Sequence, residues 1–113
     1  MAHRLFSYGT LRQHDVQLSL FGRSVPTADD VLPGFRIDWL EITDPHTIAT
    51  SGSDRHPILR PGAPTESVAG GCLELGDAEL AAADSYEVDD YQRIAVTLAS
   101  GLQAWAYVAA RQP

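Results

Sequence analysis

Five segments of the chain have the side-chain pattern of β-strands, and only two have that of α-helices. In the strand segments apolar residues tend to alternate with polar ones, which is the two-residue period of a pleated strand. Strands and helices do not alternate strictly along the chain, so a doubly wound parallel sheet is disfavoured. We expect an α+β domain with two or so short helices on a small, mixed, strongly curled β-sheet or barrel. The expected strands are residues 5–6, 31–42, 68–75, 94–98 and 102–109, the expected helices are 16–21 and 77 to 86 or 87, and residues 24–30 are expected to be a loop.

The length and composition are those of one soluble domain. Its 113 residues suffice for a single core, so residues 1–113 are expected to form one domain. The formal net charge of −7 argues against nucleic acid or an anionic membrane as a partner. All eight basic residues are arginine, which excludes Schiff-base chemistry through a lysine. Because Cys72 is the one cysteine and neither a signal peptide nor a membrane-length apolar run is visible, we expect a cytoplasmic protein.

The segment Tyr8-Gly9-Thr10-Leu11 directly follows the first expected strand. A glycine at the exit of a strand can adopt a positive φ angle and lets the backbone approach a ligand closely. Successive N–H groups from Gly9 to Leu11 could then point into one concavity, which suits a carboxylate or a developing oxyanion. The alternative is an ordinary turn between a strand and the next element.

Residues 44–66 form the longest stretch without an evident helix or strand pattern. Four of the seven prolines lie in it. Loops of this length in small domains are often lids or binding loops, although a simple insertion explains the pattern equally well. His46 and His56 lie in the stretch, but no cysteine or carboxylate at ligand spacing accompanies them, so we expect no metal site.

The second expected helix places Leu80, Ala83 and Glu87 on one face, because they recur at intervals of three and four. Leu80 and Ala83 mark this face as inward, so Glu87 is expected to point toward the core or a cavity in it. Desolvation, the helix C-terminus and the nearby Asp84 would each raise the pKa of the Glu87 carboxyl group. A raised pKa suits a group that takes and returns a proton near neutral pH. The alternative is a surface Glu87 that pairs with Arg93.

Four short motifs follow one another at characteristic separations: Tyr-Gly-Thr-Leu, Asp-x-Tyr-Glu, Tyr-x-Arg and Ala-Trp-x-Tyr. They occupy residues 8–11, 84–87, 91–93 and 104–107. In this order they resemble the γ-glutamylcyclotransferase-like family, including its small bacterial and plant AIG2-like branch. The resemblance covers residues 5–109. This chain departs from the family pattern at Ala83, where leucine is usual, and at Val88, where glycine is usual.

The resemblance implies the family's fold and an enzyme that converts a γ-glutamyl amine or amino acid to 5-oxoproline and the free amine. Glu87 would be the catalytic acid/base, and neither a metal nor an organic cofactor would be needed. The substrate's own α-amino group is the nucleophile, which is consistent with a sequence that lacks a serine or cysteine nucleophile motif. The implied substrate-binding residues are Tyr8, Gly9, Thr10, Leu11, Tyr91 and Tyr107. We interpret Arg93, the arginine of Tyr-x-Arg, as structural.

Two other interpretations stay open. The first is a non-catalytic module that binds carboxylate-bearing metabolites on the same fold, and both Val88 and the unusual 44–66 stretch favour such divergence. The second is a small interaction domain in which the segment after the first strand is only a turn. For the enzyme the expected partner is a small-molecule γ-glutamyl substrate. The sequence identifies neither the leaving amine nor the oligomeric state.

Overall fold

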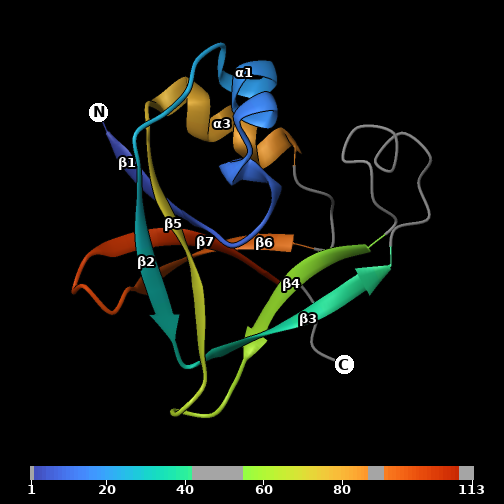
Figure 1. Cartoon of the computed structure of the whole chain (residues 1–113), viewed down its shortest axis with the longest axis vertical. Helices are drawn as coiled ribbons and strands as arrows, with labels where there is room; N and C mark the ends of the chain where they lie inside the picture. Colours follow the sequence, from blue (N-terminus) through green and yellow to red (C-terminus); the bar gives the residue numbers. More distant parts are fainter. Residues whose placement is uncertain (1, 42–54, 87–90, 110–113) are drawn as a thin grey trace.

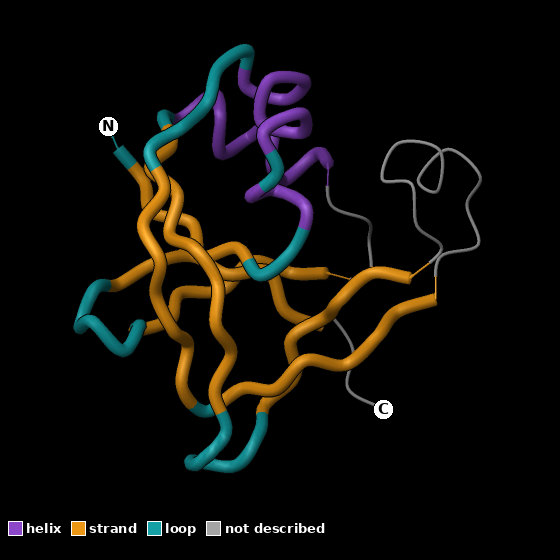
Figure 2. Tube along the Cα trace, viewed as in Figure 1, coloured by secondary structure: helices purple, strands orange, loops and turns teal. Residues whose placement is uncertain are grey.

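The computed structural model describes residues 2–41, 55–86 and 91–109, which form one seven-stranded sheet, two α-helices and a 3₁₀ turn (Figure 1). Both α-helices lie on the same side of the molecule, next to β1 and β5 (Figure 2). The elements in chain order are β1 (His3–Ser7), the 3₁₀ turn η1 (Thr10–Arg12), α1 (His14–Phe21), β2 (Thr27–Pro33), β3 (Phe35–Glu41), β4 (Arg55–Pro61), β5 (Ser67–Leu75), α3 (Asp77–Tyr86), β6 (Tyr91–Thr97) and β7 (Gln103–Ala109).

The sheet is mixed, and its hydrogen-bonded order is β2-β5-β1-β7-β4-β3, with β6 also paired to β7. β7 pairs in parallel with β1 and with β4, whereas the β6–β7, β1–β5, β2–β5 and β3–β4 pairs are antiparallel. The expected mixed α+β architecture is therefore confirmed. Within the described residues the order is an open path and not a closed ring, so the expectation of a barrel is not confirmed.

The strands at the two ends of this path, β2 and β3, are consecutive in the chain and are joined by a bend at Gly34. Gly34 separates β2 from β3 and has φ of +79°, a left-handed conformation that favours glycine. Its N–H donates to the carbonyl of Glu66 at 2.8 Å. Two predictions are corrected here: residues 24–30 are not all loop, because β2 begins at Thr27, and the strand expected over 31–42 is divided at Gly34.

The prediction that residues 44–66 lack regular structure is wrong for 55–61, which form β4. Pro57 and Pro61 stand opposite Trp39 and Phe35 in the β3–β4 register. At every second position of an antiparallel pair the backbone N–H points away from the partner strand, and Pro57 and Pro61 occupy such positions opposite β3. Proline has no N–H, so it costs no hydrogen bond to the partner strand there. Both prolines thus fit a strand whose other neighbour, β7, is paired at the single described position Leu59–Val108. Residues 42–54, including His46, lie outside the described residues.

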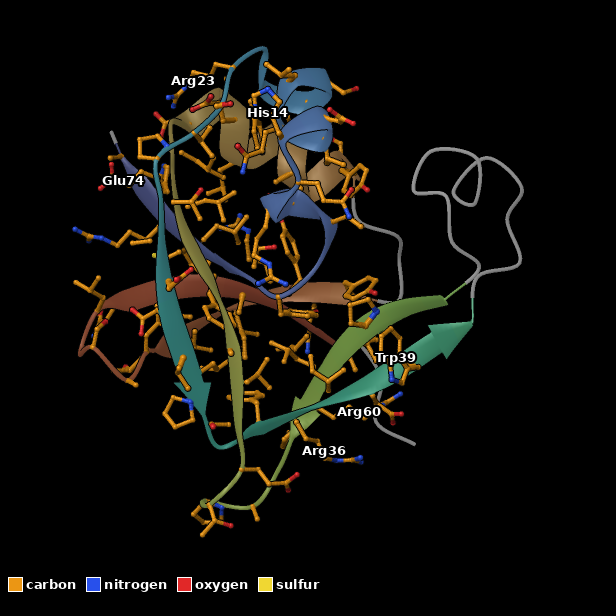
Figure 3. All side chains as sticks on the ribbon, viewed as in Figure 1. His14, Arg23, Arg36, Trp39, Arg60 and Glu74 are labelled. Carbon is orange, nitrogen blue, oxygen red and sulfur yellow. The ribbon has the colours of Figure 1, made fainter. Side chains whose placement is uncertain are left out.

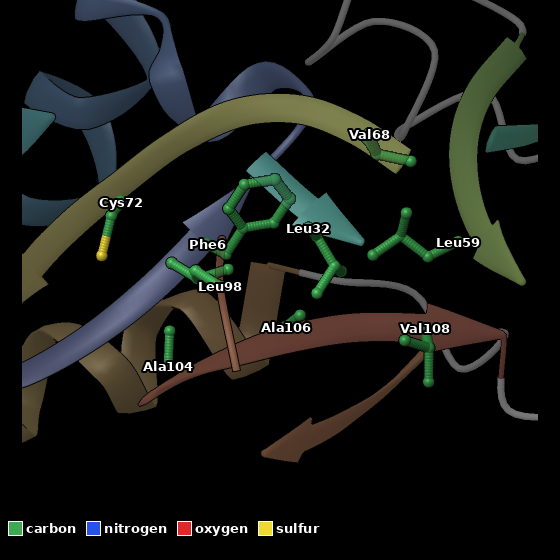
Figure 4. Close-up of a cluster of buried hydrophobic side chains, with 9 residues drawn as sticks. All are labelled: Phe6, Leu32, Leu59, Val68, Cys72, Leu98, Ala104, Ala106 and Val108. Atoms are coloured by element: carbon green, nitrogen blue, oxygen red, sulfur yellow. The ribbon is translucent and has the colours of Figure 1, made fainter. Parts of the chain in front are cut away.

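The core has two parts, one on each face of β1. Leu5 and Phe6 are adjacent, point to opposite faces and are both fully buried, so β1 is covered on both sides. The Phe6 side contains a cluster drawn from β1, β2, β4, β5 and β7, together with Leu98, which directly follows β6 (Figure 4). The Leu5 side packs against the helices, where Leu80 and Ala83 of α3 are 6% and 0% exposed. The predicted inward face of α3 is therefore confirmed for these two residues.

An ion pair ties the end of α1 to the start of α3. α1 ends at Phe21, and its C-cap, Gly22, has the left-handed φ of 72° that is typical of this position. The next residue, Arg23, donates from Nε and Nη2 to the two carboxylate oxygens of Glu79, both at 2.8 Å. Glu79 also accepts the N–H of Gly76 at 2.8 Å, which is the reciprocal half of a capping box. Gly76 is therefore the N-cap of α3, and Asp77 is the first residue of the helix.

Two aspartates bind the backbone N–H of the following residue on the strands at the ends of the path. Asp30 on β2 accepts from Val31 N–H at 2.8 Å and from the Ser100 hydroxyl at 2.6 Å. Asp38 on β3 accepts from Trp39 N–H at 2.9 Å. These hydrogen bonds, led by the Ser100 hydroxyl for Asp30 and by the Trp39 N–H for Asp38, lower the pKa of both carboxyl groups.

None of the described helices is long and apolar enough to span a bilayer.

Candidate active site

The loop after β1 is held by backbone hydrogen bonds and by side chains, among them Arg12, which donates to the carbonyls of Tyr8 and Gly9. Gly9 has φ of −138° and ψ of −142°, so it does not use the positive φ that a glycine at this position could adopt. A Cβ at Gly9 would lie 3.4 Å from Cγ of Pro57, so a larger side chain would fill the space between the loop and β4. Leu11 is 3% exposed and packs in the core, which leaves its backbone as the part that can face a ligand. Arg12 N–H donates to the Gly9 carbonyl at 3.3 Å and closes the turn.

Gln17 on α1 holds this loop through hydrogen bonds between its side chain and the backbone. Its side chain is buried, its amide nitrogen donates to the Leu11 carbonyl at 3.0 Å, and its amide oxygen accepts from Val25 N–H at 3.1 Å. Both polar atoms of the side chain are therefore used. Leu11 and Val25 would otherwise present buried backbone groups without partners, which proteins rarely tolerate.

Two hydroxyl groups join the loop to elements far away in sequence. The Tyr8 hydroxyl donates to the backbone carbonyl of Tyr107 on β7 at 2.6 Å. Thr10 Oγ1 and the Tyr86 hydroxyl lie 3.0 Å apart and share a hydrogen bond. Tyr86 is the last residue of α3, so the loop touches both β7 and the C-terminal end of that helix.

Asp84 anchors the last turn of α3 to the β6–β7 pair. Its Oδ1 accepts from the Tyr107 hydroxyl at 2.7 Å and from Arg93 Nε at 2.8 Å, and its Oδ2 accepts from Arg93 Nη2 at 3.0 Å. The guanidinium group of Arg93 also lies 4.5 Å from the centre of the Trp105 ring, in a cation–π contact. The charge of Asp84 is thus paired with that of Arg93. The sequence argument for Glu87 had treated Asp84 as an unpaired charge and is corrected on this point.

Tyr91 of β6 is hydrogen-bonded to the residue of β4 that the loop also faces. Its hydroxyl donates to the carbonyl of Pro57 at 2.8 Å, and Pro57 is the residue whose ring faces Gly9. Tyr91 and Gly9 therefore contact the same residue of β4. Residues 87–90 are outside the described residues, so the predictions for Glu87 and Val88 stay predictions.

The predicted site residues thus fall into two groups. The Tyr8 hydroxyl is hydrogen-bonded to the backbone of Tyr107, and Thr10 is hydrogen-bonded to Tyr86. Gly9 and Tyr91 both lie next to Pro57. Leu11 contributes a buried side chain. The residues that sequence reasoning missed here are Gln17, Pro57 and Tyr86. The family motifs pointed to Tyr86 by position, whereas no local pattern could pair Gln17 with the backbone of Leu11 and Val25.

The described residues contain no group of three or more histidine, cysteine, aspartate or glutamate side chains that could hold a metal ion. The buried Cys72 has a pKa raised by desolvation, so its thiol is unreactive compared with an exposed one. The described site therefore offers hydroxyl groups, backbone N–H groups, the Arg12 guanidinium group and one Asp–Arg pair.

The architecture is shared with solved proteins. Two Arabidopsis thaliana proteins studied in solution superpose with TM-scores of 0.76 and 0.77, at 23% and 21% sequence identity. The alignments cover 96% and 99% of this chain but 62% and 71% of theirs, so this chain spans less than two thirds of the first. A structure described as "Gamma-glutamyl cyclotransferase" superposes with a TM-score of 0.75 at 14% identity, over 98% of this chain and 68% of that one. At these identities the likeness establishes the fold.

The sequence comparisons place the chain in a family. A search of curated proteins gave no match. The model of the family described as "Gamma-glutamyl cyclotransferase, AIG2-like" matches residues 5–113, which is nearly the whole sequence. The chain belongs to the γ-glutamyl cyclotransferase, AIG2-like family.

Proposed function

We propose that this protein is a γ-glutamylcyclotransferase that converts a γ-glutamyl amine or amino acid to 5-oxoproline and the free amine. Family membership supports this class of reaction. The observation that carries the proposal is the 3.0 Å hydrogen bond between Thr10 Oγ1 and the Tyr86 hydroxyl. It holds the proposed carboxylate-binding loop against the end of α3. The proposed acid/base, Glu87, directly follows Tyr86 in the sequence.

In the proposed reaction the α-amino nitrogen of the substrate attacks its own γ-carbonyl carbon. The α-ammonium group first gives a proton to Glu87, and the free amine then forms the C–N bond of a five-membered lactam. The tetrahedral intermediate collapses, the C–N bond to the leaving amine breaks, and the leaving nitrogen takes a proton from Glu87. The lactam nitrogen then gives its extra proton to the released amine, which departs as an ammonium ion. No water is consumed. Holding the two groups of one molecule in contact lowers the barrier by up to about 7–11 kcal/mol.

The described residues supply binding and support in this scheme. The N–H groups of the loop at residues 9–11 would bind the α-carboxylate or the oxyanion. Tyr91 and Tyr107 would line the site, and the hydroxyl of Tyr107 also helps to hold α3 through Asp84. Arg93 keeps the interpretation given from the sequence, because its bidentate contact with Asp84 joins β6 to α3.

The test measures 5-oxoproline release from a panel of γ-glutamyl amines and amino acids. Glu87→Gln keeps the size of the side chain but cannot carry a proton, so we expect kcat to fall at least about 100-fold. Glu74→Gln is the matched control, because Glu74 is an exposed carboxylate on β5, and we expect wild-type activity from it. Near-normal turnover by folded Glu87→Gln would refute the assignment. If the folded wild-type protein binds γ-glutamyl ligands but turns over no member of the panel, the non-catalytic binding module is the better description.

A further inference from the structure

Trp39 is an exposed aromatic residue on a strand that borders the candidate site. Its side chain is 60% exposed, more than those of Leu18 and Leu102, which are 45% and 40% exposed. Figure 3 shows it toward the far end of β3, beside β4. The indole ring has a large apolar surface, which contributes to binding when a ligand covers it. Tryptophan is accordingly enriched among the residues that carry most of the binding energy in interfaces.

The strand register connects Trp39 to the site through Pro57. The two residues stand directly opposite each other in the β3–β4 pair. Trp39 N–H donates to Asp38 and Pro57 has no N–H, so this is a pair without ladder hydrogen bonds, whose Cα atoms are typically about 4.5 Å apart and whose side chains share a face. The ring of Pro57 faces Gly9, and its carbonyl accepts from Tyr91. Pro57 therefore lies next to Trp39 in the sheet and next to Gly9 in the loop, so it connects the two.

The face of the hairpin that carries Trp39 is apolar at the register positions from Phe35 to Trp39, and the next pair on it, Glu41–Arg55, is charged. Alternation places Ile37 and Leu59 on that face, and both belong to or pack against the buried core. The charged residues Arg36, Asp38 and Arg60 alternate onto the other face, where Arg60 Nε donates to Asp38 at 3.1 Å. On the side of Ile37 and Leu59, a group resting on Trp39 and Pro57 would thus meet an apolar surface.

We propose that Trp39 and Pro57 form the subsite for the leaving amine, and that this subsite takes an amine with an alkyl chain or an aromatic ring. The inference rests on the cyclotransferase function proposed above. The γ-glutamyl part of the substrate is held at the loop of residues 9–11, so the group beyond the scissile bond can extend past Gly9 over Pro57. Covering the indole with an apolar group removes both from water, which favours such amines over small polar ones.

The test compares three substrates: γ-glutamyl-phenylethylamide, γ-glutamyl-methylamide and the γ-glutamyl amide of a polyamine. We expect Trp39→Ala to lower kcat/KM for the phenylethylamide at least tenfold and to change that for the methylamide less than twofold. Trp39→Phe keeps an aromatic surface and is expected to retain most of the preference. Leu102→Ala, which truncates an exposed apolar residue of the β6–β7 hairpin, is the control and should leave both values unchanged. Trp39→Ala should fold, because the side chain is mostly exposed.

The outcomes separate the subsite from the reaction. Turnover that falls equally for all substrates in Trp39→Ala, or falls most for the polyamine amide, overturns the apolar subsite and leaves the function standing. If the wild type releases no 5-oxoproline, the function fails, and the Trp39 indole N–H signal in an NMR titration tests the subsite alone. A larger shift with the phenylethylamide than with the methylamide supports it, and no difference overturns it. A shift that follows protein concentration without ligand shows that Trp39 contacts a second copy, which also overturns it.

Discussion

Replacing Gln17 with methionine tests whether one buried amide positions the proposed substrate loop. The substitution nearly preserves side-chain volume but leaves the Leu11 carbonyl and the Val25 N–H without their present partners. Each orphaned buried group costs about 1–3 kcal/mol. The more apolar methionine returns about 1–2 kcal/mol. Taking the midpoints of these ranges for the two groups, we expect a loss of about 2–3 kcal/mol in the free energy of unfolding. This is a large share of the about 5–15 kcal/mol of a typical domain.

Urea unfolding followed by circular dichroism measures this difference, with equal m-values as the check that only stability has changed. Gln13→Met is the matched control: Gln13 is exposed and its side chain does not cap α1, so the same substitution should change stability by less than about 0.5 kcal/mol. We also expect a higher KM for γ-glutamyl substrates in Gln17→Met, because the Leu11 backbone loses its support. A loss below about 0.5 kcal/mol in Gln17→Met would refute the reasoning that the amide satisfies these two backbone groups.

Two further predictions follow from contacts elsewhere in the sheet and helices. Gly70→Ala would place a Cβ 2.4 Å from the Ser7 carbonyl oxygen, so we expect β1 and β5 to shift and stability to fall by about 1–3 kcal/mol in urea unfolding; an unchanged midpoint would contradict this. The pKa of Glu79 is lowered chiefly by its hydrogen bond from Arg23, so the pair stabilises the protein above the ordinary glutamate pKa and this contribution is lost as pH falls below it. The urea midpoint should accordingly drop on acidification, and Glu79→Gln should make that drop smaller; an identical pH profile in the variant would count against the pairing.

The strands and helices with regular apolar spacing were predictable from the sequence. The α3 helix, β5 and the β6–β7 hairpin follow the patterns expected of them, and the inward positions of Leu80 and Ala83 follow from helical spacing alone. β2 was missed because it lies at the end of the sheet order, where most of its side chains are exposed and the two-residue alternation is absent. Edge strands often lack this signal, because only part of their surface is buried.

β4 was missed for a different reason. Its prolines were counted as signals of a loop, yet Pro57 and Pro61 are four residues apart and occupy equivalent positions that need no hydrogen bond to β3. Composition identifies a proline-rich stretch but not which edge of a strand each missing N–H faces. The register could only be known once the partner strand was known.

The candidate site was predictable where motifs carry it and unpredictable where tertiary contacts do. The motifs indicated Tyr8, Thr10 and Tyr107, which hydrogen bonds connect to one region. The positive φ considered for Gly9 is not adopted, because a glycine in a sequence does not show whether its conformation or its contacts matter. That distinction depends on Pro57, which is 48 positions away and belongs to a strand that the sequence had not revealed.

The aspartate contacts on β2 and β3 have a consequence for self-association. An unpaired strand edge offers donors and acceptors to another chain and is a common starting point for aggregation. Asp30 occupies the N–H of Val31, and Ala99 N–H occupies the carbonyl of the same residue at 2.8 Å. Asp38 likewise occupies the N–H of Trp39. At these positions neither outer strand can extend its ladder to a second molecule, so the carboxylates act as local stops against amyloid-like strand addition.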